Sequence, residues 1–232
     1  PSRPYTLTFI FYFSIITLIK LIGFFMTAII DYEVGNLFSL ISSLKYVGID
    51  AILTDDEKII KNADAIILPG VGAFRDALAK LEKKNDGILK NVIIEEAKKG
   101  KLILGICLGM QMLFDKSYEY GEYKGLELIK GSICPIYKDL KNKDLKVPHM
   151  GWNNLNIRKE DKIFKYIKNM EYVYFVHSYY GKNCDDSIIA DSEYDIIIPA
   201  IVKKNNIYGI QFHPEKSGNT GLNILRGFKD LI

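Results

Sequence analysis

Cys107 is the residue whose surroundings most suggest covalent chemistry. It follows the apolar run Leu102–Ile106 and lies between Gly105 and Gly109 in a G-x-C-x-G pattern that continues as a helix-like sequence. A sharp strand-to-helix turn needs neighbours without side chains, and it exposes the residue at its tip as a nucleophile. The amide groups of the helix that begins there would favour a thiolate. The alternative interpretation is a buried structural thiol.

His213 is the best candidate for the general base that such a cysteine requires. The chain has three histidines, and only His213 both ends an apolar run, Ile207–Phe212, and has a carboxylate two residues further on. Glu215 could bend back and orient the imidazole ring. Without the cysteine motif, the H-P-E segment would be read as a surface turn.

A glycine-containing loop supplies the third candidate element. The apolar segment Ala65–Leu68 runs into Pro69–Gly72, whose backbone N–H groups could bind a developing oxyanion, with the N–H of Leu108 as a second donor. Removing one such donor typically costs about 3 kcal/mol of transition-state stabilisation. Taken alone, the loop would be read as a simple turn after a strand.

Composition limits the classes of protein that fit. The chain has 232 residues, 48% of them apolar and 25% charged, which suits one globular domain with a core. The net charge of +3 and the scattered lysines do not favour a nucleic-acid-binding protein. Cys107, Cys134 and Cys184 show no C-x-x-C spacing, so the sequence predicts neither a disulfide framework nor a metal site and is typical of a reducing cytoplasm.

The elements that must position these residues alternate between short apolar runs and amphipathic segments. This alternation predicts an α/β fold with an open, mixed, mostly parallel sheet flanked by helices. The expected strands of the first half are Thr27–Asp31, Ala51–Thr54, Ala65–Leu68 and Leu102–Ile106, and the expected helices are Asn36–Val47, Phe74–Lys84 and Ile88–Lys99. After Gly121, a partly antiparallel half is expected, with strands Leu126–Ser132, Glu171–Tyr179, Pro199–Lys204 and Ile207–Phe212, before a closing helix Gly218–Ile232. Residues 26–232 are thus predicted to form one domain.

Residues 1–25 form an apolar extension that this domain does not require. Their length suits a membrane span or a signal core, but Lys20 would lie inside the span and no A-x-A cleavage site follows. Because Met26 directly precedes the first expected strand, we favour an upstream extension outside the fold. A membrane anchor is the alternative.

Three motifs, in chain order LPGVGAF (68–74), GICLGMQ (105–111) and QFHPEKS (211–217), resemble those of the class I (triad) glutamine amidotransferases across residues 26–232. Three further segments, IDYEVGNLFSL (30–40), PHMGWN (148–153) and YFVHSYYG (174–181), are similar to those of the glutaminase subunits of imidazole glycerol phosphate synthases. Glu33 departs from this pattern, because the family commonly has glycine there, and the local shape of the loop is therefore open.

The resemblance implies hydrolysis of glutamine through a thioester on Cys107, with His213 as the proton carrier, Glu215 as its orienter and no cofactor. The oxyanion would be bound by the backbone at Val71 and Gly72 together with Leu108, and glutamine would be held by Gln111, Glu119 and the backbone of Ser178 and Tyr179. The Glu119 carboxylate could pair with the α-ammonium group of glutamine, although the sequence around it also suits a solvated acidic residue. His149 and His177 have no carboxylate at triad spacing, so they are not expected to be catalytic.

The resemblance also implies a partner, the (β/α)₈ cyclase subunit of imidazole glycerol phosphate synthase, which would receive the ammonia in a heterodimer. The positions expected to face it are Asn36, Trp152, Tyr174 and Lys216. The active site is expected to be completed only when the cyclase has bound its ligand, by switching of the P-G-V-G peptide. Two alternatives remain at this point: a glutaminase that serves another synthase, such as the aminobenzoate or anthranilate enzyme, and a non-catalytic scaffold.

Overall fold

The computed structural model describes residues 25–33 and 37–232 of the chain. The expected extension 1–25 lies outside this range except for Phe25, and Asn36 also lies outside it. Within the described residues, no helix combines the length and apolar character needed to cross a membrane.

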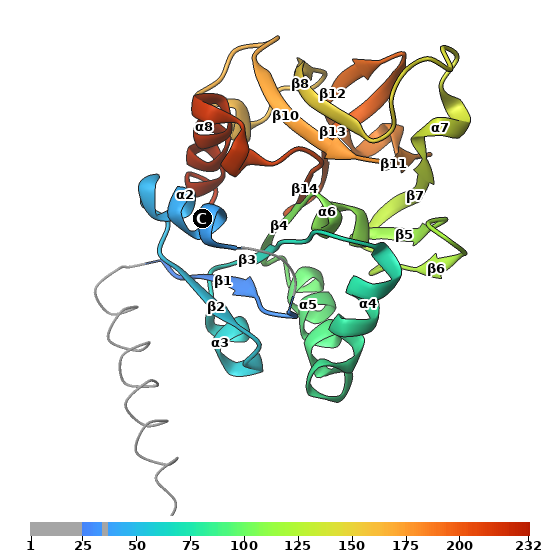
Figure 1. Ribbon diagram of the computed structural model, residues 1–232. Coiled ribbons are helices and arrows are strands. Elements are labelled where there is room, and N and C mark those ends of the chain that lie inside the picture. The colour runs from blue at the N-terminus through green and yellow to red at the C-terminus, as the bar shows by residue number, and fades with distance from the viewer. Residues whose placement is uncertain (1–24, 34–36) are drawn as a thin grey trace, which may run out of the picture.

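An eight-stranded sheet in the order β2-β1-β3-β4-β14-β13-β12-β9 forms the centre of the fold (Figure 1). The five strands from β2 to β14 pair in parallel, and β14, β13, β12 and β9 pair antiparallel. The strands are β1 Thr27–Ile30, β2 Ala51–Thr54, β3 Ala65–Leu68, β4 Leu102–Ile106, β9 Asn156–Ile157, β12 Ile188–Tyr194, β13 Ile196–Lys204 and β14 Ile207–Ile210. The predicted mixed, mostly parallel sheet is therefore confirmed.

Helices cover both faces of this sheet, as continuous apolar runs in parallel strands require. The α-helices are α2 Phe38–Tyr46, α3 Glu57–Asn62, α4 Phe74–Lys83, α5 Ile88–Lys98, α6 Leu108–Met112, α7 Ile136–Asp139 and α8 Gly218–Lys229. Alternate residues of β1 enter two separate cores, with Ile29 packing in the core of α2 and α8, and Ala28 and Ile30 packing in the core of α3, α4 and α5. The carboxyl end of β4 consequently emerges between two packed layers, where Cys107 follows it.

Two smaller sheets extend the second half of the chain. One pairs β8 His149–Asn154 with β10 Tyr172–His177, and the other has the order β11-β7-β5-β6, with β5 Phe114–Ser117, β6 Tyr123–Lys124, β7 Ile129–Pro135 and β11 Tyr179–Lys182. All four strands predicted for this half are wrong in their bounds: β13 begins at Ile196 instead of Pro199, β14 ends at Ile210 instead of Phe212, and the other two differ as follows. Leu126–Ser132 is replaced by β7 because Glu127 has a positive φ of 56°, and the expected Glu171–Tyr179 divides into β10 and β11 at Ser178.

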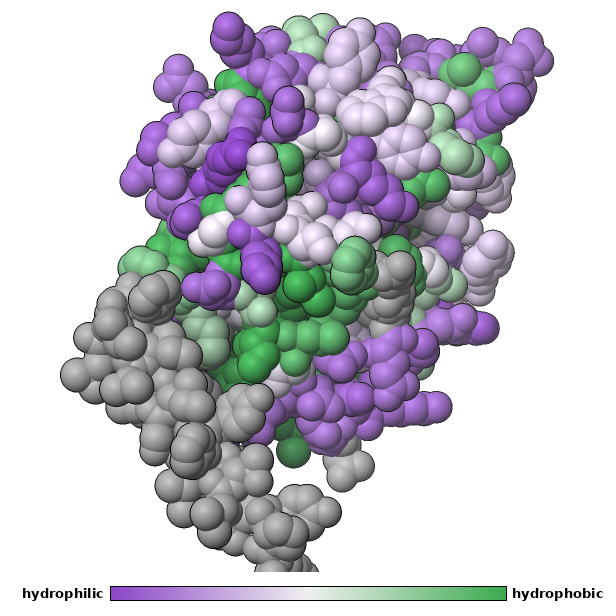
Figure 2. Space-filling model, turned by 60° about the vertical axis from the view of Figure 1, so that its left-hand side comes forward, coloured by the Kyte–Doolittle hydropathy of each residue, from purple (hydrophilic) through white to green (hydrophobic). Residues whose placement is uncertain are grey.

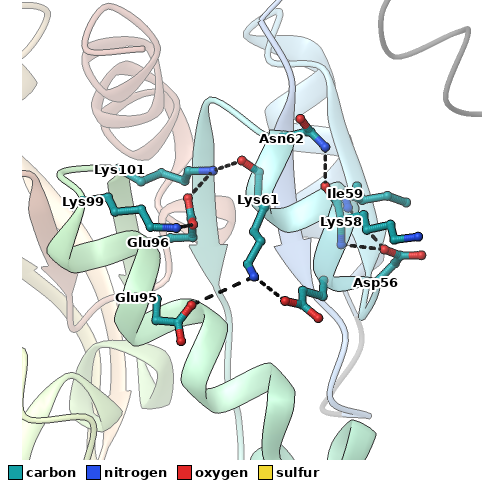
Figure 3. A network of polar contacts seen from close by, with 10 residues as sticks. Asp56, Lys58, Ile59, Lys61, Asn62, Glu95, Glu96, Lys99 and Lys101 are labelled. Carbon is teal, nitrogen blue, oxygen red and sulfur yellow. Dashed lines mark hydrogen bonds and ion pairs between the residues drawn. The ribbon is translucent and has the colours of Figure 1, made fainter.

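An ionic network ties α3 and α5 to the start of β4 (Figure 3). The buried Glu96 carboxylate pairs with Lys101 at 2.9 Å and with Lys99 at 2.7 Å. Burial opposes the charge of Glu96, but the two lysines outweigh burial and lower its pKa. Lys101 also donates to the carbonyl oxygens of Ile60 and Lys61 at the end of α3. The network thereby holds the amino end of β4, which lies opposite the Cys107 turn at its carboxyl end.

Candidate active site

Cys107 occupies a strained turn between β4 and α6, with φ 53° and ψ −110°. A Cβ atom added at Gly109 would lie 1.8 Å from the Leu68 carbonyl oxygen, and one added at Gly105 would lie 2.7 Å from the Gly109 carbonyl oxygen. Both contacts are far below van der Waals distance, so these positions admit only glycine. The strained elbow predicted from the G-x-C-x-G pattern is confirmed.

His213 and Glu215 lie next to each other, and the His213 ring contacts the Cys107 sulfur. His213 ends the segment after β14 and precedes the short 3-10 helix Pro214–Lys216, which turns Glu215 back so that its Oε1 lies 2.7 Å from His213 Nδ1. Burial alone lowers the pKa of His213, but its contacts with the Cys107 sulfur and the Glu215 carboxylate outweigh burial and raise the pKa to about 9. At neutral pH the ring is therefore an imidazolium beside the sulfur, and it can give a proton to a leaving group.

The glycine loop lies against the helix start in a closed arrangement. The N–H of Leu108 donates to the Gly70 carbonyl oxygen at 3.3 Å, so this expected oxyanion donor is already occupied. The Tyr32 hydroxyl donates to the Pro69 carbonyl oxygen at 2.5 Å, deep in the protein. Gly72 has a φ of 100°, which favours glycine. Two hydrogen bonds thus hold the loop with a carbonyl group, not an N–H, turned towards Leu108.

A cavity of about 810 Å³ opens above Cys107. Its lining includes almost all the residues that the sequence predicted for catalysis and glutamine binding: Val71, Gly72, Cys107, Leu108, Gln111, Glu119, Ser178, Tyr179 and His213. Lys216, which was predicted to face the partner, also lines it, whereas Glu215 lies behind His213. Residues separated by more than a hundred positions in sequence therefore meet around one space.

Glu119 is buried at the edge of this cavity. Its carboxylate accepts the backbone N–H of Phe74 at 2.5 Å, which is the start of α4 directly after the glycine loop. Burial raises the pKa of Glu119, the N–H of Phe74 opposes this shift, and the charge of Asp76 adds to it. The predicted solvated acidic residue is therefore wrong as an alternative, and a cationic ligand group would stabilise this carboxylate.

Gln211 is a buried contact of the nucleophile that the sequence analysis did not single out. Its Nε2 lies 3.8 Å from Cys107 Sγ, and its Oε1 accepts from Gln111 Nε2 at 3.0 Å. Gln111 Nε2 also donates to the Tyr179 carbonyl oxygen at 3.1 Å. Because the Tyr179 carbonyl oxygen can only accept, Gln111 must present its NH₂ group to it and to Gln211 Oε1. The Gln211 NH₂ group is thereby directed towards the Cys107 sulfur. The only signal was its place two residues before His213.

Several expected partner-facing residues lie on β8 and β10, at the surface. Trp152 is 53% exposed and packs edge-to-face on Tyr174, its cross-strand neighbour, with ring centroids 5.9 Å apart. Trp152 is therefore a surface residue and not part of the core. Met150 and Tyr172 on the same strands are also exposed. Figure 2 shows one face of the molecule, on which hydrophobic residues, in green, gather between hydrophilic ones, in purple.

Glu33, the departure from the expected glycine, has a φ of 64°. This left-handed conformation explains why glycine suits the position. Here the Glu33 side chain pairs with Lys84 at 3.0 Å, and Lys80 donates to its carbonyl oxygen at 2.8 Å. Contacts with α4 and the turn after it thus hold Glu33 in this left-handed conformation. Across the residues described, no group of three or more His, Cys, Asp or Glu side chains is placed to hold a metal ion.

The fold, the cysteine elbow and the His–Glu pair define a class of protein, and sequence comparison agrees with it. The profile of the family "Glutamine amidotransferase class-I" matches residues 28–230. The chain belongs to the class-I glutamine amidotransferase family.

Curated relatives are similar over nearly their whole length. "Imidazole glycerol phosphate synthase subunit HisH" of Caldanaerobacter subterraneus is 51% identical over 208 residues, which is 89% of this chain and 98% of the relative. The protein of the same name from Oceanobacillus iheyensis is 48% identical over 89% of this chain and all of its own. Among solved structures, PurLQS from Thermotoga maritima has a TM-score of 0.67 at 20% identity, covering 89% of this chain and 98% of that one, which shows the shared fold.

Proposed function

We propose that Cys107, His213 and Glu215 hydrolyse the side-chain amide of glutamine. The observation that carries this proposal is the cysteine on a strained elbow beside an imidazolium that a carboxylate orients, with the cysteine and the histidine lining one 810 Å³ cavity. The thiolate of Cys107 adds to the amide carbon, and the tetrahedral adduct then releases ammonia as His213 gives its proton to the nitrogen. Water, deprotonated by His213, cleaves the glutamyl thioester and frees glutamate.

Glutamine binding falls to the residues around the cavity. The buried Glu119 carboxylate would bind the α-ammonium group of glutamine. Burial disfavours the charged form of Glu119 and raises its pKa, and the ammonium group would supply the opposite charge that stabilises the carboxylate. Gln111 and the backbone of Ser178 and Tyr179 would contact the rest of the amino acid. The oxyanion would be bound by Leu108 N–H and the loop at Val71 and Gly72.

The closed loop implies a resting state with low activity. Because the Gly70 carbonyl occupies the Leu108 N–H, the oxyanion site requires that this peptide turn over. We propose that docking of the ligand-bound partner favours the turned arrangement. Comparable glutaminase rates with and without that partner would contradict this switch.

The ammonia serves the cyclase subunit of imidazole glycerol phosphate synthase in histidine biosynthesis. That subunit converts N'-[(5-phosphoribulosyl)formimino]-AICAR ribonucleotide to imidazole glycerol phosphate and AICAR. Relatives that carry the synthase name and are 44–51% identical over about nine-tenths of this chain support this role over an aminobenzoate or anthranilate synthase. The intact triad argues against a non-catalytic scaffold.

The partner would dock on the exposed Trp152 and the half-buried Tyr174 that packs on it, with Lys216 beside the cavity mouth. Asn36 is proposed to contact the partner as well. Aromatic side chains of this kind often dominate the binding energy of an interface. We place the heterodimer in the cytoplasm, where reducing conditions keep the free thiol of Cys107.

Trapping of the thioester tests the chemistry. The protein is mixed with glutamine, the reaction is quenched with acid, and the protein is digested. The mass of the peptide that contains Cys107 is then measured by mass spectrometry. A glutamyl adduct on this peptide is expected, and Cys134 provides an internal control for non-specific modification. Turnover without any adduct in the wild type, or equal turnover by Cys107→Ala, would contradict the mechanism.

A further inference from the structure

Two buried histidines lie beside the active site without belonging to the triad. His149 starts β8 and His177 ends β10, where the strand register pairs them. The His149 ring is stacked between Phe175 and Tyr194, with centroid distances of 4.8 and 4.1 Å. His149 Nδ1 and His177 Nε2 are 3.0 Å apart. The aromatic stack fixes the plane of one ring, and that ring fixes the other.

These rings form the middle of a line of four polar contacts. His177 Nδ1 lies 2.8 Å from the Tyr179 carbonyl oxygen, and His149 Nε2 lies 3.1 Å from Asn153 Oδ1. Asn153 Nδ2 then donates to the Glu193 carbonyl oxygen at 3.0 Å. Both ends of the line are carbonyl oxygens, which only accept hydrogen bonds.

Counting protons along this line gives a definite result. In a neutral imidazole one ring nitrogen donates and the other accepts. Asn153 likewise has one acceptor in this line, Oδ1, and one donor, Nδ2, so the three neutral groups supply three donors for four contacts. Burial lowers the pKa of His177 to about 3, with the nearby His149 adding to this effect, and burial also lowers the pKa of His149. Both rings are therefore neutral at pH 7, with one N–H group each, and one of the four contacts has no proton between its two atoms.

The contact without a proton is the one between His149 Nε2 and Asn153. It is the longest of the three ring contacts, and Asn153 is only half-buried, so water can compensate there. The other two ring contacts are then both hydrogen bonds: His149 Nδ1–H donates to His177 Nε2, and His177 Nδ1–H donates to the Tyr179 carbonyl oxygen.

We propose that His149 and His177 are positioning residues. His149 holds His177 in the Nδ1–H tautomer, and the Nδ1–H group of His177 then fixes the Tyr179 carbonyl group. This carbonyl also accepts from Gln111, whose other N–H leads through Gln211 to the Cys107 sulfur. One fixed oxygen thus orients both the proposed glutamine-binding segment and the donor to the nucleophile. The catalytic consequence rests on the proposed function, whereas the tautomer does not.

Nitrogen NMR of the imidazole rings tests the tautomer directly. The chain has only three histidines, so ¹⁵N-histidine labelling yields three ring systems, which His149→Phe helps to assign. At pH 7.5 and without glutamine, we expect a proton on Nδ1 alone in both His149 and His177. A proton on Nε2 of His177, alone or together with Nδ1, would overturn the proposal. This spectrum is independent of turnover.

Two substitutions at one position then test the catalytic role. In His177→Asn the side-chain amide takes the place of the Nδ1–H donor, whereas His177→Leu removes it. We expect His177→Leu to raise KM for glutamine about tenfold, as for one lost hydrogen bond to a fixed partner, and His177→Asn to stay near the wild type. Tyr194→Phe, which keeps the ring stacked on His149 and loses only the hydroxyl contact to Lys146, should behave like the wild type.

Equal effects of the two His177 substitutions, or no effect of either, would contradict the positioning role. If His177→Leu does not fold, the ring spectrum and the His177→Asn kinetics still decide the matter. A wild-type protein that hydrolyses no glutamine would contradict the proposed function instead, and the ring spectrum would then decide the tautomer alone.

Discussion

Replacing Gln211 with leucine tests whether the buried amide stabilises the Cys107 thiolate. Gln211 is 0% exposed, and its Nε2 is the side-chain amide nitrogen that the structure places next to Sγ, at 3.8 Å. A hydrogen bond to a charged group contributes about 1.5–3 kcal/mol, and the long nitrogen–sulfur distance favours the lower end. The substitution should therefore reduce kcat/KM for glutamine about tenfold, because 1.4 kcal/mol corresponds to one factor of ten.

Two assays on this variant report different quantities. Glutamate release gives kcat/KM, and the rate at which iodoacetamide alkylates Cys107 at pH 7, followed on its peptide by mass spectrometry, gives the thiolate population. Both should fall in Gln211→Leu, and more in Gln211→Glu, which brings a second negative charge to the sulfur.

Ser192→Ala is the matched control for this experiment. Ser192 is another buried polar residue, and its hydroxyl has no hydrogen-bond partner among the described residues, so its removal should leave both rates unchanged. Wild-type alkylation and kcat/KM in Gln211→Leu would refute the reasoning, as would an equal loss in Ser192→Ala.

Four further predictions follow from the described contacts. Tyr32→Phe removes a bond that holds the glycine loop closed, so the glutaminase rate without partner should rise; an unchanged or lower rate would contradict this. His213 should titrate near pH 9 by NMR, so the stability that its charge gives is complete below its ordinary pKa of about 6.5 and is lost as pH rises through 9; in Cys107→Ala the pKa should drop, and an unchanged value would contradict the sulfur's part. Trp152→Ala should weaken binding of the cyclase by about 2 kcal/mol, roughly 30-fold by calorimetry, with the rate of the isolated subunit unchanged; wild-type affinity would exclude Trp152 from the interface. Glu96→Gln should lower the free energy of unfolding by about 2 kcal/mol in urea titrations, and an unaltered midpoint would show that the network in Figure 3 adds no stability.

The parallel half of the fold could be predicted almost residue by residue. Strands such as Ala65–Leu68 and Leu102–Ile106 are buried on both faces, so their apolar runs stand out against the amphipathic helices between them. The prediction of Phe74–Lys84 differs from α4 by one residue. Local pattern and tertiary burial agree in this half, which is why the sequence is informative there.

The second half was predicted less well because its strands are defined by distant partners. β8, HMGWNN, has no run of apolar residues, and it is a strand because β10 pairs with it. β12 was missed although it pairs with β13 along most of its length, since its sequence IIADSEY mixes apolar and acidic residues. Short, half-exposed strands of this kind carry little periodicity of their own.

The site shows the same division. The elbow at Cys107 and the His213–Glu215 pair follow from local spacing, so the sequence was sufficient for them. The contact of Gln211 with the sulfur and the occupation of the Leu108 N–H by Gly70 depend on how separate segments pack, and no spacing indicates them.

Glutamate release from glutamine, measured for this protein alone and together with the nucleotide-bound cyclase subunit, tests the central claim most directly. We expect slow release by the isolated protein, strong acceleration by the ligand-bound cyclase, and no release from Cys107→Ala in either condition. Activity that does not respond to the cyclase would assign the glutaminase to another synthase, and wild-type protein without activity in both conditions would contradict the account.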